Sequence, residues 1–337
     1  MKIAIHHNKQ SFSTRWIEYC RKQNIPYKIV NCYESDIIEQ LSDCYFLMWH
    51  FHHLDYRDAI FAKQLIFAIE QKGIKVFPNF QTCWHFDDKV GQKYLLESIA
   101  APMVKSHIFY SKKEALKWIN NTSFPKVFKL RGGAGASNVR LVNNKAGAIK
   151  VIKKAFGKGF SQYNGWGSFS NKVRLYKMNK VTRLDLIKSF IRIFFSTNFA
   201  RMHGREKGYV YFQDYIPNNN FDIRIIAING NFFGIKRMVR ENDFRASGSG
   251  TIIYSKDEID IRCIKIAKDV SQKLNTQSIA FDFIFNEKNE PLIIEISYGF
   301  SYAAYDLCEG FWDNDLNWHG DKFSPQEWMV EALIRTK

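Results

Sequence analysis

The chain has 337 residues, 46% hydrophobic and 24% charged, which is ordinary for a soluble globular protein with two or three domains. Its six scattered cysteines contain no CxxC pair, which argues against a disulfide framework or a cysteine zinc site and favours a reducing cytoplasm. No uncharged apolar run approaches the roughly 18 residues of a membrane span, and the N-terminus lacks a signal-peptide core. The formal charge of +16 favours acidic partners such as nucleotides, nucleic acid, anionic lipid or anionic glycan.

Residues 1 to about 80 alternate short apolar strands with helices, which predicts a parallel sheet covered by helices. The expected strands are 2–5, 27–30, 44–51 and 75–77, and the expected helices are 13–23, 36–41 and 59–69. Five histidines fall in this region, namely His6, His7, His50, His52 and His53. Because no acids or cysteines accompany them at a fixed spacing, a substrate-facing rim or plain surface is a better interpretation than a metal site.

Residues 84–98 predict a helix with Asp87 or Asp88 near its N-cap. Lys89 lies in the first turn, where a cation gains nothing from the helix dipole. We therefore expect its side chain either to be solvated or to reach outward to an anion.

Residues 124–142 predict two strands joined by a glycine-rich turn. Lys129 ends the first strand, and the turn contains Gly132, Gly133, Gly135, Ala136 and Ser137. Glycines let backbone N–H groups approach a polyphosphate closely, and a lysine supplies a point charge. The segment fits neither the Walker pattern nor the dinucleotide fingerprint, so a phosphate-binding loop and a plain hairpin turn both remain open.

Three arginines, Arg224, Arg237 and Arg245, lie on or beside consecutive predicted strands, and an Asn-Gly turn joins the first two strands. Guanidinium groups in such an array suit the charged oxygens of a phosphoryl-transfer reaction. The strand that precedes them leads into the segment Gln213, Asp214, Tyr215 and Ile216.

The stretch 279–300 predicts two apolar strands joined by a polar turn. Each strand carries one acid, Asp282 or Glu295, and Ser297 follows two residues after the second acid. A buried acid is costly unless it is paired or bound to a cation, and these oxygen donors suit Mg²⁺. A surface hairpin whose acids face water is the alternative.

Taken in order, these motifs resemble the ATP-grasp superfamily of carboxylate–amine ligases, and they look closest to the branch of the ribosomal-protein glutamate ligase and glutathione synthetase. The resemblance covers roughly residues 80 to 300, apart from one insertion. It implies that Lys89 and Lys129 contact phosphate, that residues 132–137 close over the phosphates, and that residues 213–216 meet the adenine largely through backbone groups. It also implies phosphate or acyl-phosphate contacts for Arg224, Arg237 and Arg245, and Mg²⁺ ligation by Asp282, Glu295 and Ser297.

Two residues depart from the family pattern, because Ser297 and Ser247 stand where the family usually has asparagine. A serine hydroxyl is a weak neutral ligand, so a catalytically silent ATP-binding module stays open. A phosphotransferase on the same scaffold, with a hydroxyl as acceptor, is a second alternative. A nucleic-acid-binding protein is favoured only by the net charge, since no aromatic stacking motif of an RNA-binding module is present.

The resemblance implies a mixed fold, α/β plus α+β, in which a parallel-sheet domain at 1–80 precedes a two-lobed ATP-grasp fold. The N-terminal lobe is expected at 81–212 and the C-terminal lobe at 213–337. The implied reaction uses ATP and Mg²⁺ to convert a carboxylate into an acyl phosphate, which an amine displaces to form an amide. The sequence names neither substrate; a surface glycan or a peptide is the acceptor we consider.

An insertion at about 150–207 is not explained by the family pattern, and it contains fourteen basic and two acidic residues. Within it, Leu184, Ile187, Ile191 and Phe194 recur at helical spacing, with basic residues beside them. An anionic membrane surface, an anionic glycan acceptor, or packing on the protein's own lobe would each account for this pattern, and nucleic acid is less favoured. We therefore expect a cytoplasmic protein that is peripheral at the inner face of the membrane.

Overall fold

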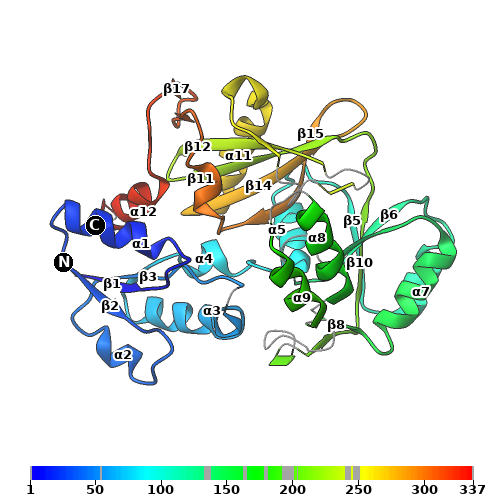
Figure 1. Ribbon diagram of the computed structural model, residues 1–337, viewed down its shortest axis with the longest axis horizontal. Helices are drawn as coiled ribbons and strands as arrows, with labels where there is room; N and C mark the ends of the chain where they lie inside the picture. Colours follow the sequence, from blue (N-terminus) through cyan, green and yellow to red (C-terminus); the bar gives the residue numbers. More distant parts are fainter. Residues whose placement is uncertain are drawn as a thin grey trace. The chain divides into compact units, whose positions relative to one another are not determined.

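The computed structural model of the chain is shown in Figure 1. It describes residues 2–53, 55–132, 138–161, 165–177, 181–191, 201–202, 204–239, 244–245 and 251–335. Across these ranges, no helix is both long enough and apolar enough to span a membrane.

A four-stranded parallel sheet forms from the first eighty residues, as the alternating pattern predicts. Its strands are β1 (Ile3–His6), β2 (Tyr27–Val30), β3 (Phe46–Met48) and β4 (Lys75–Phe77), in the order β2-β1-β3-β4. The connecting helices are α1 (Ser13–Lys22), α2 (Ile37–Gln40) and α3 (Tyr56–Gln71). The predicted strand 44–51 is too long, because residues 49–51 are buried in a loop rather than paired in the sheet. The sequence of a buried apolar run predicts a strand whether or not its backbone is hydrogen-bonded into the sheet.

A seven-stranded antiparallel sheet forms from the C-terminal half. Four long strands make its centre: β11 (Phe221–Ile228), β12 (Asn231–Met238), β14 (Ser278–Phe285) and β15 (Pro291–Ser297). Short strands β13 (Ile252–Ile253), β16 (Phe311–Trp312) and β17 (Trp318–His319) complete it. The predicted Asn-Gly turn between β11 and β12 is confirmed, with positive φ at both Asn229 and Gly230.

Helices cover this antiparallel sheet on both faces. Helix α11 (Ile261–Leu274) packs on one face through a core that includes Ile225, Phe281 and Phe283. The other face shares a core with β1, α1 and α12 (Pro325–Arg335), which includes Ile226 and Phe233. The parallel sheet and the antiparallel sheet therefore share one continuous core.

A second antiparallel sheet, with the order β5-β10-β6-β7, has a core of its own. Its strands are β5 (Ser106–Phe109), β6 (Lys126–Lys129), β7 (Val139–Val142) and β10 (Val210–Asp214). Helices α6 (Lys112–Trp118) and α7 (Lys145–Ala155) contribute to this core. Helices α8 (Gly165–Lys177) and α9 (Arg183–Ile191) follow in the chain and pack on each other. Strands β8 (Phe160–Ser161) and β9 (Arg205–Glu206) form a small separate ladder.

The predicted helix 84–98 begins later than expected, as α5 (Lys89–Ser98), because residues 84–88 form a turn after the short helix α4 (Phe80–Cys83). Asp88 lies at the start of α5, where its carboxylate accepts the N–H of Gly91 at 2.9 Å, as the capping prediction requires. By contact, the chain divides into two compact units. Unit 1 comprises residues 1–86, 95–103 and 217–337, and unit 2 comprises residues 87–94 and 104–216.

Candidate active site

A small group of charged residues of unit 1 lies on one face of the antiparallel sheet. Because side chains alternate along a strand, Ile223 and Ile225 of β11 point into the α11 core, and Asp222 and Arg224 point to the opposite face. Farther along β11 the same face is apolar and packs against α1 and α12. The face therefore changes from apolar to charged towards the start of β11.

The strand register places five of these charged residues opposite one another. Asp222 pairs with Arg237, Arg224 pairs with Asp282, and Asp282 pairs with Glu295 on the next strand. The predicted hairpin is thus confirmed with its two acids directly opposed. Such opposed residues have Cβ atoms roughly 4.5–5.5 Å apart.

A β-bulge on β15 is what places Glu295 on this face. The register shifts between Asp282 and Phe283, so that Ile293 pairs with Phe283 while Glu295 pairs with Asp282. Ile293 and Ile296 consequently both enter the α11 core, and Glu295 is turned away from it. Bulges commonly re-aim a side chain beside a functional site, and here the bulge spares the core a buried acid.

Arg237 is fixed by two carboxylates. Its Nε and Nη2 donate to the two oxygens of Asp222 at 2.6 and 2.7 Å, and its Nη2 lies 3.0 Å from Oδ1 of Asp282. The side chains of Arg237 and Asp222 are only 10% and 6% exposed. A buried bidentate pair of this kind holds the guanidinium in one orientation.

Arg224 is held less completely than Arg237. Its Nε approaches Oδ1 of Asp282 at 3.4 Å, but within the described ranges this buried Nε makes no hydrogen bond. The Arg224 side chain is 20% exposed. A buried guanidinium that is not fully hydrogen-bonded is costly, so the site favours a further anionic oxygen beside Arg224.

The charged groups of this cluster change one another's pKa values. Burial acts to lower the pKa of Arg224 and Arg237, but the charge of Asp282 and the other nearby acids outweighs it and keeps both above the ordinary value. Burial raises the pKa of Asp222 even though Arg237 opposes that rise. Burial also raises the pKa of Tyr305, a buried phenol beside the two arginines, to about 12. Tyr305 is therefore a neutral hydroxyl next to the cluster.

The donor set fits Mg²⁺ bound together with a polyphosphate. Among the described residues, no group of three or more His, Cys, Asp or Glu side chains could hold a metal ion by itself. Mg²⁺, however, is usually held by one or two carboxylates plus substrate phosphates and water, and Asp282 and Glu295 supply two opposed carboxylates. Ser297 is engaged locally, because its hydroxyl donates to the carbonyl of Gly299 at 2.9 Å. Its assignment as a metal ligand stays a prediction.

Unit 2 carries the predicted phosphate-contacting lysines, and both are buried. Lys89 is the first residue of α5 and Lys129 the last residue of β6; they are 5% and 6% exposed. The backbone N–H of Lys89 donates to the carbonyl of Arg131 at 3.0 Å, which links the start of α5 to the segment after β6. The sequence predicts that the Lys89 side chain either is solvated or reaches outward to an anion. Because the residue is buried, the first of these expectations is wrong. Its role towards phosphate stays a prediction.

The glycine-rich segment joins β6 to β7 as a hairpin. Leu130 donates its N–H to the carbonyl of Asn138 at 3.3 Å, just outside the turn. Gly132 is buried. The remaining predicted loop residues, Gly133, Gly135, Ala136 and Ser137, lie outside the described residues, as does Ser247.

The predicted adenine segment begins on β10, between β5 and β6. Gln213 is buried, and its side chain donates to Ser106 at 3.1 Å. The Asp214 carboxylate accepts from Lys126 at 2.7 Å. Because the Asp214 carboxylate is paired with Lys126, the adenine contact predicted for this segment would use mainly its backbone groups. Tyr215 and Ile216 follow the end of β10 as half-buried residues.

Arg245 lies in the short described range 244–245. It is half-buried, with its guanidinium 5.9 Å from the ring centre of Phe244. Its predicted role towards phosphate stays a prediction.

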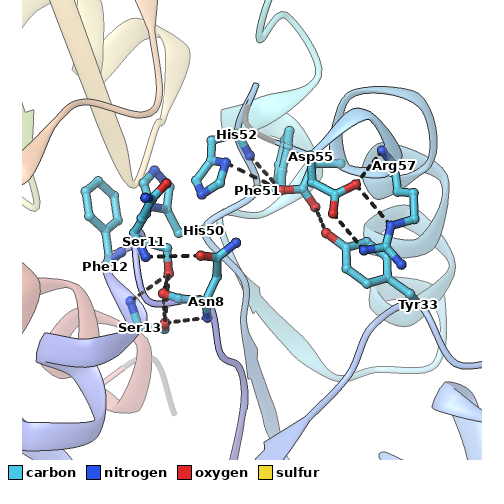
Figure 2. Close-up of polar contacts among 12 residues, drawn as sticks. Asn8, Ser11, Phe12, Ser13, Tyr33, His50, Phe51, His52, Asp55 and Arg57 are labelled. Carbon is cyan, nitrogen blue, oxygen red and sulfur yellow. Dashed lines mark hydrogen bonds and ion pairs between the residues drawn. The ribbon is translucent and has the colours of Figure 1, made fainter. Parts of the chain in front are cut away.

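Two buried histidines lie at the carboxyl ends of strands in the parallel sheet: His6 is the last residue of β1, and His50 follows β3. Cys32 donates its N–H to Nδ1 of His6 at 2.9 Å. Phe12 donates its N–H to Nδ1 of His50 at 3.0 Å; both of these residues are labelled in Figure 2. An Nδ1 that accepts a hydrogen bond carries no proton, so both rings are neutral. Burial lowers the pKa of His6 to about 4 and that of His50 well below its usual range. The plain-surface interpretation is therefore wrong for these two.

The loops after β1 and β3 flank the point where the strand order reverses. From β1 the chain moves to β2 on one side, and then to β3 on the other side. In α/β sheets, ligands bind outside the carboxyl ends of strands at such a point. Ser11, in the loop after β1, and Ser13, the first residue of α1, form a hydroxyl–hydroxyl contact of 2.7 Å there (Figure 2).

The loop after β3 packs against the segment that follows Glu295. The hydroxyl of Tyr298 donates to the carbonyl of Phe51, and a Cβ placed on Gly299 would lie 3.3 Å from Nε2 of His50. Both contacts lie inside unit 1. The strand that carries the second acid therefore continues directly into contact with the loop after β3.

A second polar network extends from the same loop. Asp58 accepts the hydroxyl of Tyr33 at 2.6 Å and the N–H of His52 at 2.9 Å. Arg57 stacks over the Tyr33 ring at 3.7 Å and forms a bidentate pair with Asp55 (Figure 2). Burial raises the pKa of Asp58 to about 6. The network holds the His52 backbone in place.

Sequence reasoning missed Asp222 and Tyr305 as residues of the site. Asp222 lies after three asparagines and reads as the end of a loop, although its spacing two residues before Arg224 put it on the same face. Tyr305 comes from a short turn of 3₁₀ helix, Tyr302–Tyr305, and has no periodic signal. His50 was singled out, but its partner Phe12 lies 38 residues away.

Comparison with known proteins identifies the fold. Residues 199–302 match the family described as RimK-like ATP-grasp domain, and no curated protein sequence matches the chain. The chain is similar to the structure of a RimK domain ATP-grasp protein from Sphaerobacter thermophilus, with a TM-score of 0.56 at 10% identity, covering 99% of this chain and 100% of that chain. The D-alanine–D-alanine ligase of Bacillus anthracis complexed with ATP gives a TM-score of 0.57 at 13% identity, covering 100% and 96%.

The biotin carboxylase of Campylobacter jejuni gives a TM-score of 0.62 at 13% identity, covering 98% of this chain and 70% of that chain. At these identities the likeness shows the fold alone. The expected fold class is confirmed, because a parallel sheet and antiparallel sheets are combined as in an ATP-grasp fold.

Proposed function

We propose that this chain, which has an ATP-grasp fold and contains a RimK-like ATP-grasp domain, is an ATP- and Mg²⁺-dependent ligase that joins a carboxylate to an amine. The observation that carries the proposal is the cluster of Arg224, Arg237, Asp282 and Glu295 on one sheet face. Arg224 in particular has a buried Nε without a hydrogen bond in the described ranges, which a phosphate oxygen would satisfy.

The roles follow from the geometry of the cluster. Arg237, held rigidly by Asp222, and Arg224 would neutralise the oxygens of the phosphoryl group in transit. Asp282 and Glu295 would hold Mg²⁺, which supplies further charge neutralisation when bound. In unit 2, Lys89 and Lys129 are buried cations that suit other phosphate oxygens.

The proposed reaction has two steps. A substrate carboxylate oxygen attacks the γ-phosphorus of ATP, which gives an acyl phosphate and ADP. An amine then attacks the acyl carbon, phosphate leaves, and an amide forms. The protein's own residues chiefly position the reactants and exclude water, because an acyl phosphate exposed to water is hydrolysed.

For one of the two organic substrates, we propose a place over the loops after β1 and β3. Support comes from the position of these loops at the reversal of strand order, and from their contact with residues 298–300 beyond Glu295. Neutral His50 and the hydroxyls of Ser11 and Ser13 offer polar groups without a net charge there. For the acceptor we propose a surface glycan or a peptide, and the basic insertion favours an acidic one.

The test is ADP release by the full chain with ATP, Mg²⁺ and libraries of carboxylates and amines, followed by mass spectrometry. Hydroxylamine added in place of the amine should trap an acyl phosphate as a hydroxamate. A phosphorylated hydroxyl product without hydroxamate would instead support the phosphotransferase. ATP binding without ADP release under every combination would support the silent ATP-binding module.

A further inference from the structure

Helix α9 (Arg183–Ile191) turns its apolar residues outward. Leu184, Ile187 and Ile191 are 66%, 55% and 50% exposed, and Phe190 is 45% exposed. We call these four residues the α9 face. The one buried residue of the helix is Ser189. An amphipathic helix of a globular protein normally does the reverse, with aliphatic residues inward and polar residues outward.

The orientation of α9 is set by its packing on α8 (Gly165–Lys177). The two helices lie against each other, and the rings of Phe169 and Phe190 meet with centroids 5.4 Å apart. For Leu184, Ile187 and Ile191, the alternative that the apolar stripe packs on the protein's own lobe is therefore not what the structure shows; Phe194 lies outside the described residues. Contiguous exposed apolar surface of this kind usually marks an interaction site.

The segment of the chain that contains α9 is strongly basic. Arg183 and Lys188 are exposed on the same helix, and residues 150–207 contain fourteen basic and two acidic residues. Both acids already have partners: Asp185 accepts from the hydroxyl and N–H of Thr182, and Glu206 accepts from Tyr209 at 2.8 Å. A partner must therefore offer both negative charge and an apolar phase.

An anionic lipid bilayer offers both of these properties. Nucleic acid and soluble glycans match the cations but give Leu184, Ile187 and Ile191 no apolar counterpart. We propose that the α9 face docks on an anionic membrane surface, with its aliphatic side chains at the headgroup–acyl boundary and the basic residues among the headgroups. This inference does not depend on the proposed ligase activity, because docking needs neither ATP nor a substrate.

The experiment is co-sedimentation of the full chain with vesicles of phosphatidylcholine alone or with roughly 30% phosphatidylserine. We expect at least about tenfold more binding to the anionic vesicles, falling as salt rises from about 0.1 to about 0.5 M. The double variant Leu184→Ser/Ile187→Ser should lose most of this binding. Lys188→Glu should weaken it as well.

Two matched controls separate docking from general adsorption. Leu307→Ser removes an equally exposed leucine in unit 1, and Lys113→Glu reverses an exposed charge on α6 of unit 2, outside the segment 150–207. Both should bind vesicles nearly as the parent chain does. Circular dichroism and ADP release should be unchanged in every variant, because none of these residues belongs to the candidate active site.

Three results would overturn the proposal. Equal binding to neutral and anionic vesicles would show that the α9 face does not select an anionic surface. Full binding by Leu184→Ser/Ile187→Ser would show that charge alone causes adsorption. Absence of vesicle binding, together with self-association that this double variant abolishes, would identify the α9 face as an interface between copies of the chain.

Discussion

The two units contain nearly equal numbers of basic residues but very different numbers of acids. Unit 1 has 24 basic and 27 acidic residues, a formal charge of −3, and unit 2 has 25 basic and 6 acidic residues, a formal charge of +19. The net charge of +16 thus belongs to one unit. A charge averaged over the chain describes neither part.

The difference also separates two uses of charge. In unit 1, arginines meet carboxylates at close range, as in the pairs of Arg237 with Asp222 and of Arg15 with Asp306. Such pairs fix geometry and produce little field at a distance. Unit 2 has too few acids to pair its cations, so its excess charge is available to external anions. The comparison assigns close-range charge pairing to unit 1 and attraction of anions to unit 2.

The largest expected effect concerns the acids of unit 1. Asp282→Asn or Glu295→Gln should lower ADP formation at least about 100-fold, because each removes a charge that would hold the metal and phosphate. The variants keep side-chain size, so folding should be retained. ADP formation by the matched variant Asp257→Asn, an exposed acid of the same unit, should be unchanged. Near-normal ADP formation by either site variant would show that the assignment is wrong.

The next prediction distinguishes the two buried arginines of unit 1. Arg237→Gln should destabilise the fold by about 3 kcal/mol or more, because it leaves Asp222 buried without its bidentate partner. Arg224→Gln should cost less than about 1 kcal/mol in stability but about 100-fold in ADP formation, since its Nε makes no hydrogen bond in the described ranges.

Urea unfolding and ADP release measure the two effects of these variants. As a control, Asp222→Asn/Arg237→Gln should recover part of the stability lost in Arg237→Gln alone. Equal destabilisation by both arginine variants would mean that Arg224 is simply part of the structural pairing.

Much of unit 1 follows from sequence, because its signals are local. The Asn229-Gly230 turn fixes the β11–β12 hairpin, and the apolar segments around Asp282 and Glu295 set their strands. The bulge could not be predicted, since the β15 segment is apolar on both sides of Glu295 and gives no alternation to fix its phase.

The remaining misses depend on contacts between distant segments. His6 and His50 read as surface residues because their N–H donors lie 26 and 38 residues away. In unit 2, the helical spacing of Leu184, Ile187 and Ile191 predicts α9, but not which side of it faces solvent. The periodic spacing of apolar residues predicts that a helix has one apolar face, but it does not show what that face contacts.

Acid should weaken unit 1 through its neutral histidines. The folded pKa of His6 is about 4, below the unfolded value of 6.5. The folded state therefore binds fewer protons, and the contribution of His6 is complete above pH 6.5 and lost as pH falls towards 4. The loss is about 3 kcal/mol. Asp58 acts in the opposite direction, because burial raises its pKa to about 6. The free-energy cost of burying its charged carboxylate is relieved as pH falls and the group is protonated.

A variant isolates the histidine contribution. His6→Asn keeps an acceptor for the Cys32 N–H but does not titrate, so its stability deficit against the parent chain should shrink by about 3 kcal/mol between pH 7 and pH 4. Hydrogen exchange at the amides of β1 and β2 measures it. A deficit that does not change with pH would show that His6 is not held neutral.

The smallest effects should have opposite signs in the two units. On α7 of unit 2, Lys150 faces Lys153 and Lys154 at i+3 and i+4, a repulsive arrangement of exposed cations. Lys150→Glu replaces two repulsions with two attractions and should stabilise α7 by about 0.5–1 kcal/mol. In unit 1, Arg15→Gln breaks the bidentate pair with Asp306 and should destabilise α1 by up to about 1 kcal/mol. Hydrogen exchange at amides of α7 and α1 resolves both changes, which should shrink in about 1 M salt because both pairs are exposed. If Lys150→Glu destabilises α7, the positive charge of unit 2 is compensated locally after all, and the contrast between the units does not hold.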